Sequence, residues 1–360
     1  MIFDECMYII FIINNLNSIS MEQLPWNVTV LDLTRLLPGG VATRLLADLG
    51  FNVIKVEDTE RGDYMRETSP EVFNYLNYGK KSISINLKDD RGREIFYELV
   101  RKSRVLIESF RSDVVKRLKI DYDTLRVLNE KLIYCSITGY GYEGPLLPNH
   151  DINCNAYAGI DKVLPVQVAD IGSSLLAVIG ILNKMWRNEG GFVDVSMARA
   201  SKLFNVMNIL TEGKSVLNGD YPCYNLYESK DGKISLGALE PKFWVNFLHA
   251  VGREELINRQ FDPDAIKDVS EIVKSYTTGE LMEIAEKHDV PIYPVRRLEE
   301  VKREFKYERG PVRGENTLEI LKILGIPEAK IKELVHDGVV SIQEKDFLTK
   351  NRQTSPFKAG

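Results

Sequence analysis

Two spacings of apolar residues alternate along the first half of the chain. Short apolar runs such as VTVLDLT (28–34) and NVIKVED (52–58) are typical of buried strands. Between them, PGGVATRLLADLG (38–50) has the spacing of an amphipathic helix that Pro38 opens and Gly50 closes. This strand–helix–strand order predicts a parallel sheet.

The alternation of strands and helices continues beyond this first strand–helix–strand unit. KSISINL (81–87), RVLIESF (104–110) and LIYCSIT (132–138) are predicted strands. KDDRGREIFYELVRK (88–102) is a predicted helix, with acidic residues in its first turn and basic residues in its last. A long apolar helix is predicted for DIGSSLLAVIGILNKMWRN (170–188). Together these elements predict a doubly wound α/β domain.

The pattern changes near Leu217. Asp231 and Gly232 stand between two strand-like runs, which predicts a hairpin. Residues 223 to about 308 therefore indicate a second, smaller α+β unit. The stretch GENTLEILKILGIPEAKIKELVHDGVVS (314–341) then predicts two short amphipathic helices.

Composition narrows the range of partners. Apolar residues make up 44% of the chain and charged residues 28%, which suits a soluble globular protein. The formal net charge of −5 argues against nucleic acid as the main partner. The four cysteines form no CxxC pair, which indicates reduced thiols and a cytoplasmic location.

The N-terminal segment 1–20 is predicted to be a non-native start or a disordered extension. Its apolar stretch, 7–13, is much shorter than the roughly 20 residues of a membrane span. Acidic residues, Asp4 and Glu5, stand where a secretory signal has basic ones. An extra strand or helix packed on the surface is the alternative, and no membrane association is predicted.

Three familiar site motifs are incomplete. The P-loop reading of YGKKSI fails because its first glycine would fall at Asn74. PGGVATRLLADLG lacks the GxGxxG spacing of a dinucleotide site. His150 and Cys154 are spaced as ligands on one helix face, but nothing nearby completes a metal site, so no metal is predicted.

Four acid–base side chains stand at predicted strand ends or helix starts. They are His150, Asp151, Asp170 and Glu240. Each has an ordinary alternative: His150 as a loop residue, Asp170 as a helix N-cap and Glu240 as a surface residue. Their positions favour a functional reading, because active sites of α/β proteins lie at the carboxyl ends of strands.

Several stretches resemble the class III CoA-transferase family. They are VLDLTRLLPGGVATRLLADLGFNVIKVED, VLIESFRSDVVKRLKI, LIYCSITGYGYEGP and the 314–341 segment, in the family's order. The resemblance runs from Val28 to Val340. Within the family, GYGYEGPLLPNHDIN and GALEPKFW are similar to the α-methylacyl-CoA racemase branch.

The resemblance implies a set of site residues. His150 and Asp170 would be the two catalytic acid–bases, with Asp151 completing the His-Asp pair and Glu240 pairing with His150. Basic residues would bind the CoA portion of an acyl-CoA substrate, without a separate cofactor; these are Lys55, Lys80, Lys81 and Arg111. Val166 departs from the racemase pattern, which has asparagine there, four residues before the aspartate.

The implied fold is a Rossmann-like large domain (21–205 and 315–360) with a parallel sheet, a linker (206–222) and a smaller α+β domain (223–314). Two such chains would interlock as a homodimer. The implied reaction is two-base proton transfer at the α-carbon of a 2-methylacyl-CoA thioester. The alternative is CoA transfer between carboxylic acids, in which Asp170 attacks the thioester as a nucleophile to form an anhydride with release of CoA thiolate, and His150 is incidental.

Overall fold

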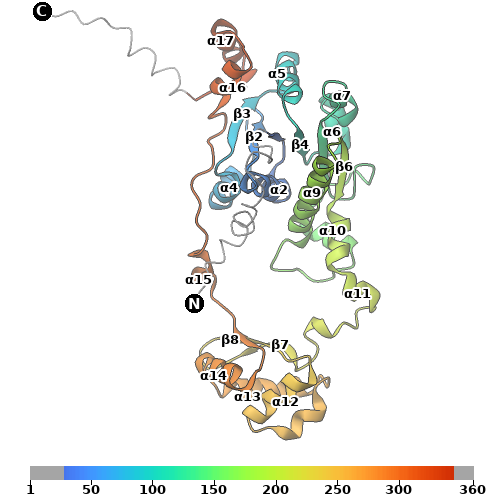
Figure 1. Cartoon of the computed structure of the whole chain (residues 1–360), viewed down its shortest axis with the longest axis vertical. Helices are drawn as coiled ribbons and strands as arrows, with labels where there is room; N and C mark the ends of the chain where they lie inside the picture. The colour runs from blue at the N-terminus through green and yellow to red at the C-terminus, as the bar shows by residue number, and fades with distance from the viewer. Residues whose placement is uncertain (1–27, 344–360) are drawn as a thin grey trace, which may run out of the picture. The chain divides into compact units, whose positions relative to one another are not determined.

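The computed structural model describes residues 28–343, so the predicted extension 1–20 lies outside the described residues. The chain divides into two compact units (Figure 1). Within the described residues, the first unit comprises 28–205 and 306–343, and the second comprises 206–305. The return to the first unit comes at Lys306 rather than 315, because Arg66 donates a hydrogen bond to the carbonyl of Pro311 at 2.7 Å.

The first unit is built on a seven-stranded sheet in the order β10-β3-β2-β1-β4-β5-β6. All its pairings are parallel except that of β10 with β3. The strands are β1 (Thr29–Asp32), β2 (Asn52–Glu57), β3 (Lys81–Ile85), β4 (Val105–Glu108), β5 (Ile133–Thr138), β6 (Gly191–Ser196) and β10 (Val340–Ser341). The predicted α/β class is confirmed. The strand order reverses between β1 and β4, and such a reversal creates a crevice at the carboxyl ends of the strands.

The first unit contains helices that cover both faces of this sheet and others that pack on those helices. They are α2 (Leu36–Asp48), α3 (Met65–Thr68), α4 (Pro70–Asn77), α5 (Asp90–Arg101), α6 (Ser112–Arg117), α7 (Tyr122–Arg126), α8 (Asp151–Tyr157), α9 (Val168–Trp186), α10 (Met197–Phe204), α16 (Thr317–Ile323) and α17 (Glu328–His336). Helices α5, α16 and α17 lie on one face, and α2 and α9 lie on the other (Figure 1).

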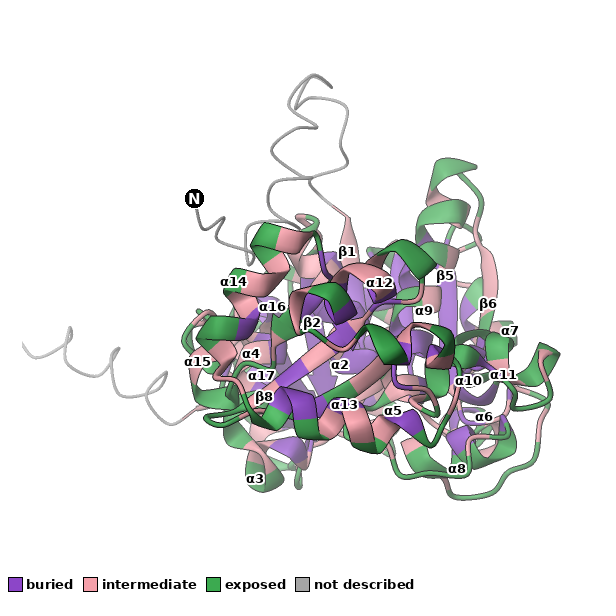
Figure 2. Ribbon diagram, turned by 90° about the horizontal axis from the view of Figure 1, so that it is seen from below, coloured by how far each residue is buried: buried purple, intermediate pink, exposed green. Residues whose placement is uncertain are grey.

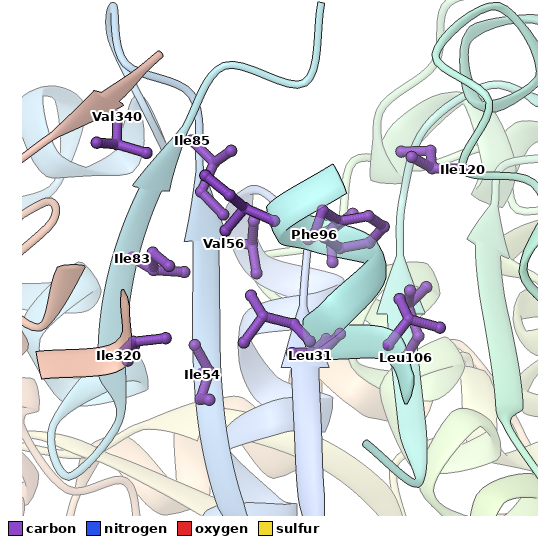
Figure 3. Packing of buried hydrophobic residues seen from close by; sticks show 14 of the residues in the cluster. Leu31, Ile54, Val56, Ile83, Ile85, Phe96, Leu106, Ile120, Ile320 and Val340 are labelled. Carbon is purple, nitrogen blue, oxygen red and sulfur yellow. The ribbon is translucent and has the colours of Figure 1, made fainter. Parts of the chain in front are cut away.

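Apolar side chains of the strands alternate between two cores. Leu31, Ile54 and Leu106 point to the α5 face with Phe96 (Figure 3). Their strand neighbours, such as Val30, point to the α2 and α9 face. β1, β4 and β5 are buried along most of their length, as Figure 2 shows for β5. Strands buried on both faces read as continuous apolar runs, which is why these strands are recognisable in the sequence.

Helix α9 carries the longest apolar run of the fold. Among residues 28–343 it is the one helix long and apolar enough to cross a membrane, judged by length and composition alone. In this unit it packs against α2, α10, β5 and β6. One face of α9 is thus buried in the domain, and 39% of its apolar window is buried in all.

The second unit contains a three-stranded antiparallel sheet in the order β7-β8-β9. Its strands are β7 (Tyr224–Glu228), β8 (Lys233–Gly237) and β9 (Ile292–Pro294), and its helices are α11 (Val206–Leu210), η3 (Val216–Asn218), α12 (Pro241–Ala250), η4 (Glu254–Arg259), α13 (Ala265–Lys274), α14 (Thr278–His288) and α15 (Leu298–Lys302). Glu228 pairs with Lys233, so the predicted hairpin at 231–232 is confirmed. Trp244 and Phe247 are fully buried in its separate core.

Candidate active site

A cavity of about 410 Å³ opens at the carboxyl end of the parallel sheet, where the strand order reverses. The turns that follow β1, β4 and β5 form its walls. His150, Asp170 and Arg111 all line it. The structure thus brings together three of the residues predicted from the sequence.

His150 reaches the cavity through the loop that follows β5. Gly139 is required in this loop because a Cβ there would lie 2.4 Å from the side chain of Asn149. The loop ends at α8, where the backbone amide of His150 donates to Asn153 Oδ1 at 2.9 Å. His150 is exposed and stands immediately before the first residue of α8. An imidazole so placed is open to a ligand in the cavity.

Asp170 lies in the first turn of α9, and the N-cap position is Gln167. The reading of Asp170 as an N-cap is therefore wrong. Burial, and secondly the negative charge of Asp151, raise the pKa of Asp170 from 3.8 to about 7. A carboxyl group with such a pKa can both accept and release a proton near neutral pH.

Asp151 is committed to hydrogen bonds. Its Oδ1 accepts from the backbone amides of Ala169 at 2.7 Å and Asp170 at 3.1 Å, and its Oδ2 accepts from Asn155 at 2.6 Å. These amides belong to the first turn of α9, where helix N–H groups have no partner within the helix. Both oxygens of Asp151 are thus engaged, so its side chain positions the neighbouring aspartate rather than handling a proton itself.

Lys80 lies in the interior of the first unit. Its Nζ is 3.2 Å from Asp32 Oδ2, and it donates to Thr43 at 2.6 Å and Asn77 at 2.9 Å. Burial is the main reason that the pKa of Lys80 falls to about 8. Every donor position of this ammonium group faces protein atoms, which argues against the predicted contact with a CoA phosphate.

Lys55 is equally buried. Its Nζ lies 3.1 Å from Asp63 Oδ2 and donates to the carbonyl of Thr34 at 3.0 Å. Burial lowers the pKa of Lys55, but the charges of Asp32 and Asp63 outweigh it, and the net shift is upward. The burial of Lys55 argues against its predicted contact with CoA as well. Instead, its hydrogen bond to the carbonyl of Thr34 stabilises the turn after β1, which forms one wall of the cavity.

Lys81 is partly exposed but lies elsewhere. It begins β3, so it stands at the amino end of that strand, and its Nζ is 2.6 Å from Glu319 Oε1. It is not among the residues that line the cavity. The structure gives no support to a shared phosphate site for Lys81 and Arg111.

Two guanidinium groups do line the cavity. Arg111 follows β4 with half of its side chain exposed, and Nη1 donates to the carbonyl of Leu146 at 3.3 Å. Arg35 follows β1, is 40% exposed and pairs with Asp58 at 2.6 Å. The sequence reasoning missed Arg35, although its position directly after a predicted strand was a usable signal. Both are partly exposed at the cavity, although Arg111 also lies 3.5 Å from Asp113 Oδ1.

Glu240 belongs to the second unit. It is the exposed N-cap residue of α12, directly before Pro241. Its predicted pairing with His150 stays a prediction, since each unit is described by itself. Among residues 28–343, no group of three or more His, Cys, Asp or Glu side chains is arranged to hold a metal ion.

Comparison with known proteins adds the family. CoA-transferase family III matches residues 26–320. Acetyl-CoA:oxalate CoA-transferase of Acetobacter aceti is 37% identical over 191 residues, which span 47% of this chain but only 49% of that enzyme. Human alpha-methylacyl-CoA racemase is 26% identical over 376 residues, covering 87% of this chain and 96% of that enzyme.

Solved structures show the same fold. A CAIB/BAIF family protein from Brucella suis has a TM-score of 0.70 at 24% identity, covering 83% of this chain and 99% of that one. A Mycobacterium tuberculosis protein has a TM-score of 0.71 at 22% identity, covering 82% and 98%. The family match covers most of the chain, and the fold is that of the solved CAIB/BAIF structure. The chain therefore belongs to CoA-transferase family III.

Proposed function

We propose that the protein inverts the α-carbon of a 2-methylacyl-CoA thioester by moving a proton, in the manner of an α-methylacyl-CoA racemase. The observation that carries this proposal is the meeting of His150 and Asp170 in one cavity. Asp170 has a pKa of about 7, which suits a group that must act as base in one direction and as acid in the other.

The chemistry follows from the acidity of a proton beside a thioester carbonyl. One group removes the α-proton, and the electrons of the broken C–H bond move into the carbonyl to give an enolate. The conjugate acid of the second group then donates a proton to the opposite face, which restores the thioester with inverted configuration. His150 suits the second role, because its exposed imidazole lines the same cavity as Asp170 and can carry a proton.

A relative with this reaction matches most of the chain length, but so does a relative with CoA transfer. The human racemase aligns with 87% of the chain at 26% identity, and human succinyl-CoA:glutarate CoA-transferase aligns with 88% at 28%. The Acetobacter transferase, 37% identical, aligns with 47%, and the succinate–glutarate CoA-transferase of Agrobacterium fabrum, 33% identical, with 56%. The higher identity of these transferases favours CoA transfer as the second candidate. In that reaction the ionised carboxylate of Asp170 would be the nucleophile, and a pKa of about 7 leaves much of it protonated at neutral pH.

The CoA portion of the substrate is assigned to the guanidinium groups at the cavity. Arg111 and Arg35 each present a partly exposed planar donor, which suits phosphate oxygens. Lys55 and Lys80 have no part in this assignment, since both are buried in ion pairs.

The decisive experiment is incubation with a 2-methylacyl-CoA in deuterated water, followed by NMR or mass spectrometry of the α-position. The racemase reaction predicts deuterium at this carbon and loss of optical purity. His150→Ala and Asp170→Asn should each abolish inversion, because inversion needs both groups. Asp161→Asn, an exposed aspartate nearby, serves as the matched control. Wild-type protein that transfers CoA between acids but incorporates no deuterium would establish the second candidate instead.

The proposed enzyme works as an interlocked homodimer. Helix α9 exposes a stripe of apolar side chains, made up of Ile171, Leu175, Ile179, Leu182 and Trp186. Apolar stripes of this kind commonly lie in subunit interfaces. A cytoplasmic location is also proposed, since the cysteines of the described residues, Cys135, Cys154 and Cys223, are buried free thiols.

A further inference from the structure

A chain of hydrogen bonds joins three helices behind the cavity. The hydroxyl of Ser201 on α10 donates to Asn155 Oδ1 on α8 at 2.6 Å. The amide of Asn155 donates to Asp151 Oδ2 at 2.6 Å, and Asp151 Oδ1 accepts from the first turn of α9 at 2.7 Å and 3.1 Å. Ser201 and Asn155 are 0% and 3% exposed, so water does not compete for the contact between them, whereas Asp151 is partly buried.

The start of α9 has no cap of its own. Gln167 occupies the N-cap position and makes no side-chain hydrogen bond to the helix, and Val166 before it is 58% exposed. A carboxylate from α8 therefore supplies the acceptor that the local sequence lacks. The two amides that it binds include that of Asp170 itself, so the backbone of this residue is fixed by the contact.

The hydrogen bonds of this chain converge on the carboxylate of Asp151. Its two oxygens receive three N–H donors. Asn155 can present its amide nitrogen to Asp151 because its oxygen is occupied by Ser201. Ser201 thus fixes the orientation of the asparagine, and the asparagine fixes the charge beside Asp170.

We propose that Ser201, Asn155 and Asp151 form a positioning chain that holds Asp170 at the cavity and places one negative charge beside its carboxyl group. The activity measurements that test this inference rest on the proposed function. The positioning role itself requires no contact between the substrate and any of the three side chains.

The other charged or titratable groups around Asp170 act from elsewhere. His150 and Cys154 come from α8 and its start, and Arg35 and Arg111 come from the turns after β1 and β4. Besides burial, the charge of Asp151 is what raises the pKa of Asp170. Removing that charge should therefore make Asp170 more acidic.

The first test is Asp151→Asn, which keeps an oxygen for the α9 amides and removes the charge. The titration of Asp170 is followed by NMR of protein labelled with carboxyl-¹³C aspartate, and Asp170→Asn identifies the signal. We expect the titration midpoint to move to lower pH by on the order of one unit. The acid limb of the exchange rate of the α-proton should move in the same direction. An unchanged midpoint in a folded variant would overturn the inference.

The second test breaks the chain at its far end. Ser201→Ala leaves Asn155 free to turn, so the exchange rate at saturating substrate should fall by about tenfold while KM stays the same, and the NMR midpoint of Asp170 should shift. Asn205→Ala is the matched control, because Asn205 at the end of α10 donates to the carbonyl of Ala158 at the end of α8 at 3.0 Å and is not one of the three residues of the chain. Equal effects of the two variants would reduce the chain to ordinary packing and overturn the inference.

The NMR titration also separates this inference from the proposed reaction. A wild type without deuterium exchange contradicts the racemase proposal alone. The midpoint of Asp170 in Asp151→Asn still decides the positioning chain in that case, because it is measured without substrate.

Discussion

Asp170→Asn should stabilise the protein in alkaline solution while it abolishes activity. Asparagine has the shape of a protonated aspartate but cannot ionise. In the folded protein, burial and the charge of Asp151 hold the pKa of Asp170 near 7, against 3.8 for an ordinary aspartate. Folding therefore opposes ionisation of this side chain, and the substitution removes that opposition.

The sign and the size of the effect follow from this difference. Below pH 4 the group is protonated in both states and adds no penalty. As the pH rises from about 4 to 7, the unfolded chain ionises first, so the folded state loses stability; above pH 7 the loss is complete. A pKa difference of this size corresponds to about 4 kcal/mol. Partial contact of the carboxyl group with solvent reduces the gain expected at pH 8.5 to roughly 2 kcal/mol.

Urea unfolding at pH 5 and pH 8.5 measures the difference. The free energy of unfolding of Asp170→Asn should exceed that of the wild type at pH 8.5. This excess should be larger than the excess at pH 5 by about 1 kcal/mol or more, because the penalty is only partly developed at pH 5. Asp161→Asn, an exposed site close in sequence, should show equal small effects at both values. If Asp170→Asn is no more stable than the wild type at pH 8.5, the carboxyl group does not carry the burial penalty, and the argument for its acid–base role loses its basis.

Three further outcomes are expected. Arg111→Ala should raise KM for an acyl-CoA at least roughly tenfold with little change in kcat, because a phosphate contact is made equally in the ground and transition states; a collapse of kcat alone in steady-state assays would contradict this. Lys80→Met should lower the free energy of unfolding by about 3 to 5 kcal/mol, because it removes a partner of the buried Asp32 carboxylate. Lys81→Met, at an exposed ion pair, should lower it by less than about 1 kcal/mol. Equal losses in urea titrations would refute the interior role of Lys80. Ile179→Glu on the exposed side of α9 should weaken the proposed homodimer, and an unchanged dimer mass in sedimentation equilibrium would count against this interface.

The sequence around Lys55 already indicates that this side chain is buried. In NVIKVED, the lysine stands between apolar residues of a strand that is buried on both faces. Such a position predicts an interior lysine, which needs a carboxylate partner. Asp32 stands in the same way inside VTVLDLT on the neighbouring strand, and the parallel register pairs these two residues. The partnership was readable from pattern, but its second carboxylate, Asp63, comes from a loop without periodicity.

The amino-acid sequence by itself determined the main strands of the parallel sheet, its long helices and the α/β class, because buried parallel strands and amphipathic helices impose periods that need no tertiary information. The family resemblance came from specific stretches of residues and not from these periods. The sequence also placed His150 and Asp170 at element ends. Only the tertiary structure decided that Asp151 binds the first turn of α9 and that Lys80 lies in the interior instead of at a phosphate. The reason is physical: a pKa, a hydrogen-bond partner and a buried charge depend on atoms brought together from distant segments, and no local spacing of residues records which segments will meet.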